Sequence, residues 1–380
     1  MPLPLSRLPL LAALVGALFS CAARASGCPP LELPAASACV ASEQGWFYAA
    51  SEAEATGMAD AARQAAAEFE RYFQHAPSRG AVVSIGSGGS ISGARKSALE
   101  AQGAAWVLPW LGPDDKRRLA ASRIRRQVEA QLGAGADVRV VDAAVAQALD
   151  KLPGGDNGTA DSALRHEIGH MLLIRAFPIA GGDATPQGNA HGYGGGFPDW
   201  LDETAAVLLE DAAMAGGRRD SLARMLACGK QDRLSPLARF FSMEHPLAAI
   251  AGQLLSGGSG NRVMMLDDER GRALGERGSD FYVQARAFAD FLIETSGDPT
   301  VFGSIARTLA AGGDMDGWLA REGSRHRLPG NVAALQDAWQ AWLDRIAATA
   351  PACHLPAEGD RATAYTGDAP RRLAEQPFHA

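Results

Sequence analysis

The motif His166-Glu167-Ile168-Gly169-His170 constrains this chain more than any other feature of its sequence. It lies in a stretch whose apolar spacing predicts a helix from Asp161 to Phe177, ended by Pro178. Two histidines four positions apart on a helix lie about 40° apart around the axis and one turn apart along it. Both imidazoles can therefore reach one metal ion, while Glu167 lies on the adjacent face.

Two interpretations of the motif are open. A pair of solvated surface histidines would need no metal, and such a motif also arises by chance. The neighbouring positions are apolar, however, and they include Leu164, Ile168 and Leu172. Burying two imidazoles on a mostly apolar helix is costly unless something satisfies their nitrogens. The apolar context therefore favours a metal site.

A zinc site needs at least a third protein ligand, and Glu203 is the candidate. It lies in the segment Pro198-Asp199-Trp200-Leu201-Asp202-Glu203-Thr204-Ala205-Ala206, where Pro198 suits the first turn of a second helix. Small residues flank Glu203, and small residues allow two helices to approach closely. The sequence therefore predicts that Glu203 joins the two histidines around one ion.

With both motifs in view, the chain resembles the gluzincin zinc metallopeptidases, and especially bacterial peptidase MA-like proteins. The resemblance rests on His-Glu-x-x-His followed by Pro-x-Trp-Leu-x-Glu-x-x-Ala. It implies that His166, His170 and Glu203 bind Zn²⁺ and that Glu167 is the general base. The implied reaction is the hydrolysis of a peptide bond in a peptide or protein substrate.

Two positions depart from the patterns of these enzymes. Thr204 follows the third ligand where the family often has Gly. Val207 stands where thermolysin-like relatives carry an Asp that orients a histidine. A carboxylate partner for the histidines must therefore come from elsewhere, and the sequence does not identify it.

Tyr282 is the first candidate for a group that stabilises the oxyanion, because a phenol can donate to developing negative charge. The competing interpretation is a core aromatic, since it follows helical spacing with other aromatic residues. Three further candidates are weaker: His191, Tyr193 and His245.

The composition describes an ordinary globular chain of 380 residues, with 47% hydrophobic and 21% charged residues. The net charge of −7 argues against a general attraction to nucleic acid. Strand and helix patterns alternate from Trp46 to Leu149, after an irregular segment over 26–44, and helical patterns follow. We expect an α+β, zincin-like fold, in which the metal cleft separates a small mixed α/β lobe over 26–152 from a mainly helical lobe over 153–355. A loose tail follows over 356–380.

Residues 1–25 have the pattern of a signal peptide. Arg7 precedes an apolar run from Leu8 to Phe19, and Ala23-Arg24-Ala25 fits a cleavage site, so the mature chain begins near Ser26. A lipoprotein is the alternative, in which Cys21 carries a lipid and attaches the protein to a membrane, although Phe19 is bulky for such a motif. Either way the sequence predicts export, to the periplasm or as a secreted protein.

The cysteines support export. Apart from Cys21, the chain has Cys28, Cys39, Cys228 and Cys353, and an even number in an oxidising compartment suggests two disulfide bonds. Three pairings are open to four cysteines, and free buried thiols are a further alternative. We favour Cys28–Cys39, which is local, and Cys228–Cys353, which joins distant parts of the C-terminal half.

Three classes of function follow from these patterns. The first is an exported zinc metallopeptidase with a Glu-activated water. The second is a zinc-binding but catalytically inactive envelope protein that binds a peptide or another protein, and the third is a metal-free binding module. Substrate preference and oligomeric state are not determined by the sequence.

Overall fold

The computed structural model describes the following residues: 27–32, 36–86, 90–133, 135–150, 157–179, 196–246 and 268–353. Several sequence predictions lie outside these ranges: the signal peptide with Cys21, the boundary between the two predicted lobes at 152/153, the candidates His191 and Tyr193, and the tail over 356–380.

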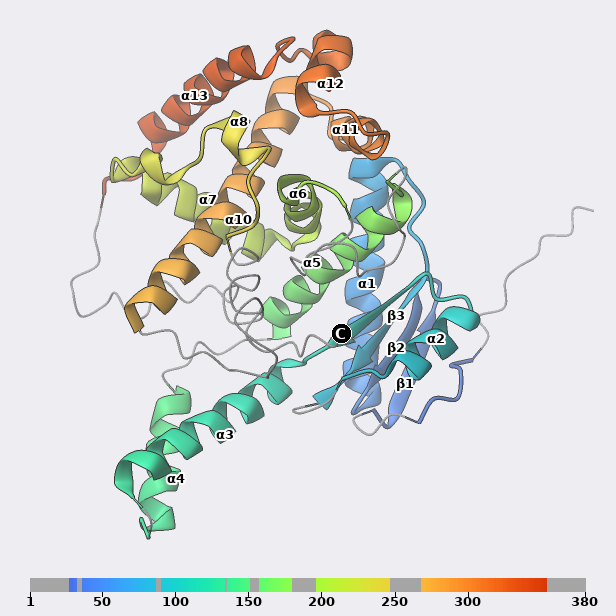
Figure 1. Ribbon diagram of the computed structural model, residues 1–380, viewed down its shortest axis with the longest axis vertical. Coiled ribbons are helices and arrows are strands. Elements are labelled where there is room, and N and C mark those ends of the chain that lie inside the picture. Colours follow the sequence, from blue (N-terminus) through green and yellow to red (C-terminus); the bar gives the residue numbers. More distant parts are fainter. Residues whose placement is uncertain are drawn as a thin grey trace, which may run out of the picture.

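The N-terminal part forms one small mixed sheet (Figure 1). Its strands lie in the order β1 (Ala38–Ser42), β2 (Gly45–Ala49), β3 (Gly80–Ser84) and β4 (Trp106–Trp110). β1 and β2 pair antiparallel, whereas β2–β3 and β3–β4 pair parallel. The predicted irregular segment over 26–44 was therefore wrong at its end, because β1 gains backbone hydrogen bonds by pairing with the apolar strand β2.

Alternation of side chains along the strands produces two apolar layers. Phe47, Val82 and Leu108 point to the face covered by helix α1 (Glu52–Phe73) and join the main core. Their neighbours Tyr48 and Val83 point to the opposite face, where Leu99 of helix α2 (Gly93–Ala101) covers them. Both faces of the sheet are therefore buried.

The rest of the described chain is almost entirely helical, so the fold is α+β with its sheet at the N-terminal end. The remaining helices are α3 (Pro113–Leu132), α4 (Val138–Asp150), α5 (Asn157–Ala176), α6 (Asp199–Leu209), α7 (Ala212–Ala227), α8 (Leu237–Phe240), α10 (Asp268–Ser296), α11 (Val301–Ala310), α12 (Met315–Glu322) and α13 (Val332–Thr349), with short 3-10 turns η2 (Gln231–Arg233) and η3 (Gly323–His326).

Helix α6 lies at the centre of the helical part (Figure 1). Every residue from Trp200 to Leu209 is buried, and a helix that is buried all round must be surrounded by other elements. The elements packed around it include α1, α5 and α10. Because α5 packs against both α1 and α6, it connects the sheet-bearing part to the helical part.

Helices α3 and α4 form a hairpin that projects away from this body (Figure 1). Residues Val138–Val141, which are rich in the valines that strands favour, form the first turn of α4. Helix α3 has a single buried residue, Asp115, and α4 has two, Val141 and Val145. The hairpin is therefore held mainly by contacts between its own two helices.

Both predicted disulfide bonds are present. Cys28–Cys39 ties the segment before β1 to the sheet, and Cys228–Cys353 ties the end of α7 to the chain just after α13. Disulfide bonds persist in oxidising environments, so the pairing indicates that the protein resides in one. Among the helices that the structure describes, none is sufficiently long and apolar to cross a membrane.

Candidate metal centre

Helix α5 carries both histidines of the motif on one buried stripe. The exposed fractions of His166 and His170 are 6% and 4%, and their ring centroids lie 5.1 Å apart. The helix begins at Asn157, before the predicted start at Asp161, and its last helical residue is Ala176, two residues before Pro178. The interpretation of the motif as a pair of solvated surface histidines is therefore wrong.

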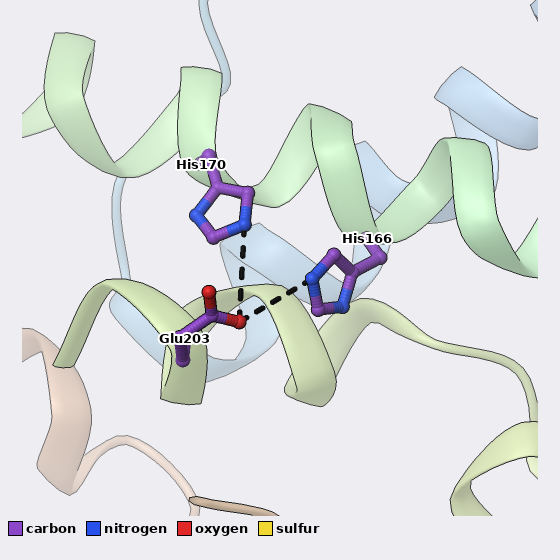
Figure 2. A group of neighbouring side chains, drawn as sticks. All are labelled: His166, His170 and Glu203. Carbon is purple, nitrogen blue, oxygen red and sulfur yellow. Dashed lines mark ion pairs between the residues drawn. The ribbon is translucent and has the colours of Figure 1, made fainter. Parts of the chain in front are cut away.

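Helix α6 brings Glu203 to the two imidazoles, as Figure 2 shows. Its Oε2 lies 3.4 Å from His166 Nε2 and 4.0 Å from His170 Nε2. The three residues each offer a ligand atom within 4.8 Å of the others, and all three are buried. Neither oxygen of Glu203 accepts a hydrogen bond from the residues described, although the side chain is only 1% exposed. This group can hold a metal ion.

The close approach of α5 and α6 depends on Gly169, which stands between the two motif residues Ile168 and His170. A Cβ at Gly169 would lie 2.8 Å from Ala206 Cα and 3.3 Å from the carbonyl oxygen of Ala205. Real Cβ atoms are not found so close to backbone, so only Gly permits this crossing. The small residues after Glu203 therefore allow the contact that the sequence predicted.

Two carboxylates hold the far nitrogens of the histidines. His166 Nδ1 is hydrogen bonded to Glu210 Oε1 at 2.9 Å, and His170 Nδ1 lies 3.0 Å from Asp202 Oδ1. A carboxylate only accepts, so the hydrogen bond to Glu210 places a proton on Nδ1 of His166, whose Nε2 faces Glu203. Asp202 lies at ion-pair distance from Nδ1 of His170, whose Nε2 also faces Glu203. These are the partners that the sequence could not identify.

The positions of these two carboxylates in the chain gave only a weak signal. Asp202 immediately precedes the third ligand, whereas Glu210 is the residue after the last turn of α6. Both stand close to Glu203 in the chain, but their proximity alone does not show which histidine each one contacts. Val207, at the position of the thermolysin-like Asp, is an apolar core residue.

Glu210 is itself held by Arg218 on α7, whose Nε and Nη2 both donate to its carboxylate. The guanidinium of Arg218 also lies over the ring of Tyr282, 4.9 Å from its centroid. The Tyr282 ring packs edge-on against His166, with centroids 5.5 Å apart. Tyr282 thus lies beside His166 of the candidate metal group, and it is also 3% exposed and part of the core.

The electrostatics of the site favour positive charge between the three ligands. Burial alone would lower the pKa of His170, but Asp202 and Glu203 outweigh it and raise the pKa to about 10. Burial alone would raise the pKa of Glu203, but His170, His166 and His245 outweigh it and lower the pKa to about 2. The carboxylate is therefore an anion, and protons or a metal ion must supply the opposing charge.

A third histidine, His245, belongs to the same neighbourhood. It is fully buried, and its Nε2 lies 3.7 Å from Glu203 Oε1, the oxygen that faces away from the histidine pair. The sequence ranked His245 as a weak candidate, because nothing in its local pattern links it to α6. Only the fold brings it there.

Glu167 is half-buried on α5, between the two histidines in sequence, and its charge contributes to the raised pKa of His170. Its role as general base stays a prediction, as does the role of Tyr282. The expected cleft between the two lobes also stays a prediction, because the candidate ligands come from two helices of the helical part, and residues 180–195 and 247–267 lie outside the described ranges.

Comparison of the chain with protein-family models, with curated proteins and with solved structures finds no match. The chemistry of the site must therefore be argued from its own residues.

Proposed function

We propose that this protein is an exported zinc metallopeptidase of the gluzincin type, with a zincin-like fold. The observation that carries the proposal is the buried group of His166, His170 and Glu203, whose ligand atoms lie within 4.8 Å of one another. Two imidazoles and one carboxylate form a ligand set that catalytic zinc sites use, and three protein ligands leave a position for water or substrate.

The carboxylates that contact the two histidines support a zinc site over a purely structural role for the histidines. Glu210 and Asp202 orient the imidazoles so that their Nε2 atoms converge on Glu203. Carboxylate–histidine pairs of this kind are typical around protein-bound zinc. A buried carboxylate without a hydrogen-bond donor among the described residues is costly unless a cation binds it, and Glu203 is such a carboxylate.

When bound, zinc supplies Lewis acidity and brings the pKa of water to about 7. In the proposed reaction Glu167 accepts a proton from the attacking water and donates it to the leaving amine. Its place next to His166 in the chain, and its charge close to His170, support this role. Tyr282 is the proposed donor to the oxyanion, and Arg218 lies over its ring.

A second function, a zinc-binding protein without catalytic activity, is favoured by one observation. The three ligands are between 1% and 6% exposed, which leaves little of them in contact with solvent. In this alternative, zinc stabilises the crossing of α5 and α6, and the protein binds a peptide or another protein.

The decisive experiment compares wild type with Glu167→Gln, after export signals are removed and the metal content is measured. Both proteins should hold one zinc per chain, and wild type should cleave a peptide library in a manner that a chelator abolishes and added zinc restores. Glu167→Gln should lose activity by at least about 10²-fold. The control is Glu129→Gln on the exposed hairpin, which should be fully active.

Each outcome separates the alternatives. Full activity in Glu167→Gln contradicts the assignment of the base. Stoichiometric zinc without cleavage by wild type favours the inactive zinc protein, and the absence of zinc from wild type after refolding with the metal contradicts the metal site.

A further inference from the structure

Helix α7 carries an arginine that reaches back to the candidate metal group. The Nε atom of Arg218 donates to Glu210 Oε2 at 2.5 Å, and its Nη2 atom donates to Glu210 Oε1. The same Oε1 atom accepts a hydrogen bond from Nδ1 of His166 at 2.9 Å. An unbroken chain of hydrogen bonds therefore runs from Arg218 through one carboxylate to the imidazole of His166.

The carboxylate in this chain of bonds is enclosed by protein. The side chain of Glu210 is 0% exposed and that of Arg218 is 14% exposed, so solvent does not replace either bond of the guanidinium. A single donor leaves a carboxylate free to turn, whereas two parallel bonds from one planar guanidinium fix both its position and its plane. Arg218 therefore decides where the acceptor of His166 lies.

The start of helix α7 is anchored close to His166. The backbone N–H of its N-cap, Asp211, donates to Oγ of Ser162 at 2.9 Å, and Ser162 lies one turn before His166 on α5. Arg218 stands two turns further along α7, with its guanidinium over the ring of Tyr282, 4.9 Å from the centroid. The guanidinium is therefore held in place relative to the helix that carries the histidines.

We propose that Arg218 is a positioning residue for the candidate metal group, which fixes the ring of His166 by holding the Glu210 carboxylate at two points. Nε2 of this ring faces Glu203, at 3.4 Å from Oε2. An imidazole binds a metal through the nitrogen that carries no proton, and the hydrogen bond at the other nitrogen decides which one that is. The inference rests on the proposed metal site, but it does not require peptidase activity.

The first test variant is Arg218→Lys, which keeps the positive charge but replaces the two-point fork by a single ammonium group. Arg219→Lys, at the next position of α7, is the matched control. Arg219 also holds a carboxylate at two points, that of Asp290, at 2.8 and 3.0 Å. Among the described residues, Asp290 is bonded to Arg219 and Arg286 and not to a histidine.

A second set of variants separates orientation of the ring from stability of the fold. Arg218→Met alone leaves the Glu210 carboxylate buried without its partner, which destabilises the protein. Glu210→Leu combined with Arg218→Met removes both charges, so stability should return. The double variant also lacks the acceptor for Nδ1 of His166. Metal affinity should therefore stay low in this variant if Arg218 acts through the orientation of the ring.

Two measurements are made on the mature, disulfide-bonded protein, and neither depends on catalysis. The first is NMR of the metal-free protein with ¹⁵N-labelled histidines, which records the Nδ1–H signal of His166 and its exchange with water. The signal is assigned by its loss in His166→Gln. The second is a titration with Zn²⁺ against a competing chromophoric chelator. Circular dichroism and denaturant unfolding establish that each variant is folded under these conditions.

We expect Arg218→Lys to weaken zinc affinity by about 10-fold, the lower end of the range for groups that support metal ligands. Exchange of the Nδ1–H proton of His166 should become faster, because its acceptor is no longer fixed. Arg219→Lys should keep the wild-type affinity and signal. The double variant should be as stable as wild type to within the recovery described, yet bind zinc at least about 10-fold more weakly.

Two results would overturn the inference. One is wild-type zinc affinity together with wild-type proton exchange in Arg218→Lys. The other is a return of zinc affinity along with stability in the double variant, which would show that Arg218 acts on stability alone. If wild type binds no zinc, the proposed metal site fails and the inference fails with it, whereas a wild type that binds zinc but cleaves no peptide contradicts only the peptidase.

Discussion

The crossing of α5 and α6 and the hairpin of α3 and α4 are both pairs of helices, but they differ in what surrounds them. At the crossing, ten of the eleven residues of α6 are buried, and His166, His170 and Glu203 lie inside. In the hairpin, Leu132, Val138 and Val140 are between 51% and 65% exposed. The residues of the candidate metal group are therefore enclosed by packing, whereas the hairpin leaves large apolar side chains in solvent.

The ion pairs in the two regions differ in the same way. At the crossing, Glu210 is 0% exposed and pairs with Arg218, which is 14% exposed. In the hairpin, Arg125 and Asp142 are 42% and 54% exposed. Water screens the hairpin pair, whereas the buried pair leaves an uncompensated charge when one partner is removed. Substitutions at the crossing should therefore have the larger effects.

The largest effect is expected from Glu210→Leu. This change leaves Arg218 buried without its carboxylate, and losing one partner of a buried pair costs about 3–5 kcal/mol. Denaturant unfolding measures the change. The double variant Glu210→Leu with Arg218→Met should recover most of the stability, because no buried charge is then left alone. A loss of less than about 1 kcal/mol in the single variant would show that the pair is solvated in solution.

Gly169→Ala tests how closely the two helices approach. The added Cβ would lie 2.8 Å from Ala206 Cα, so the helices must separate, at a cost of about 1–3 kcal/mol. Gly57→Ala is the matched control, because it is also inside a helix but has open space around its Cβ position. The control should stabilise the protein by about 0.5–1 kcal/mol. Equal behaviour of the two variants would contradict the close crossing.

The free energy of unfolding should depend on pH through Asp290, which lies in the packed centre of the protein. It accepts hydrogen bonds from Arg219 on α7 and Arg286 on α10. Burial raises the pKa of its carboxyl, but these arginines outweigh burial and lower it. The stabilisation is therefore present above the unfolded-state pKa, near 3.9, and is lost as the pH falls through the folded-state value.

Unfolding of wild type and Asp290→Asn from pH 7 down to pH 3 checks this dependence. Wild type should be the more stable protein at pH 7, and the difference should shrink towards pH 3. A difference that stays constant over this range would show that the charge of Asp290 does not contribute.

The smallest effect is expected in the hairpin. Leu132→Gln replaces a side chain that is 51% exposed, so the free energy of unfolding should change by no more than about 0.5 kcal/mol. Zinc affinity should be unchanged. A larger loss, measured by the same denaturant method, would show that the tip of the hairpin packs against another part of the protein or a second copy.

Local patterns in the sequence predicted the helix that carries His166 and His170, to within a few residues at its start, the helical character of the C-terminal part, and the three residues of the candidate metal group. The spacing of His166 and His170 depends only on helix geometry, and Glu203 stands in a recognisable second motif. The alternation of strand and helix patterns after Trp46 agrees with β2, β3 and β4, whereas β1 was not predicted, because its residues gain their structure from pairing with β2. The favoured disulfide pairing agrees with the structure, although the sequence alone allowed three.

The tertiary structure alone decided the surroundings of those ligands. Glu210, Asp202 and His245 reach the site because α6 crosses α5 at Gly169 and because α10 packs beside them. Helical periodicity specifies which residues share a face, but it does not specify what another element places against that face. The chain therefore encodes the ligands locally, whereas the groups that hold and orient them depend on how distant elements pack.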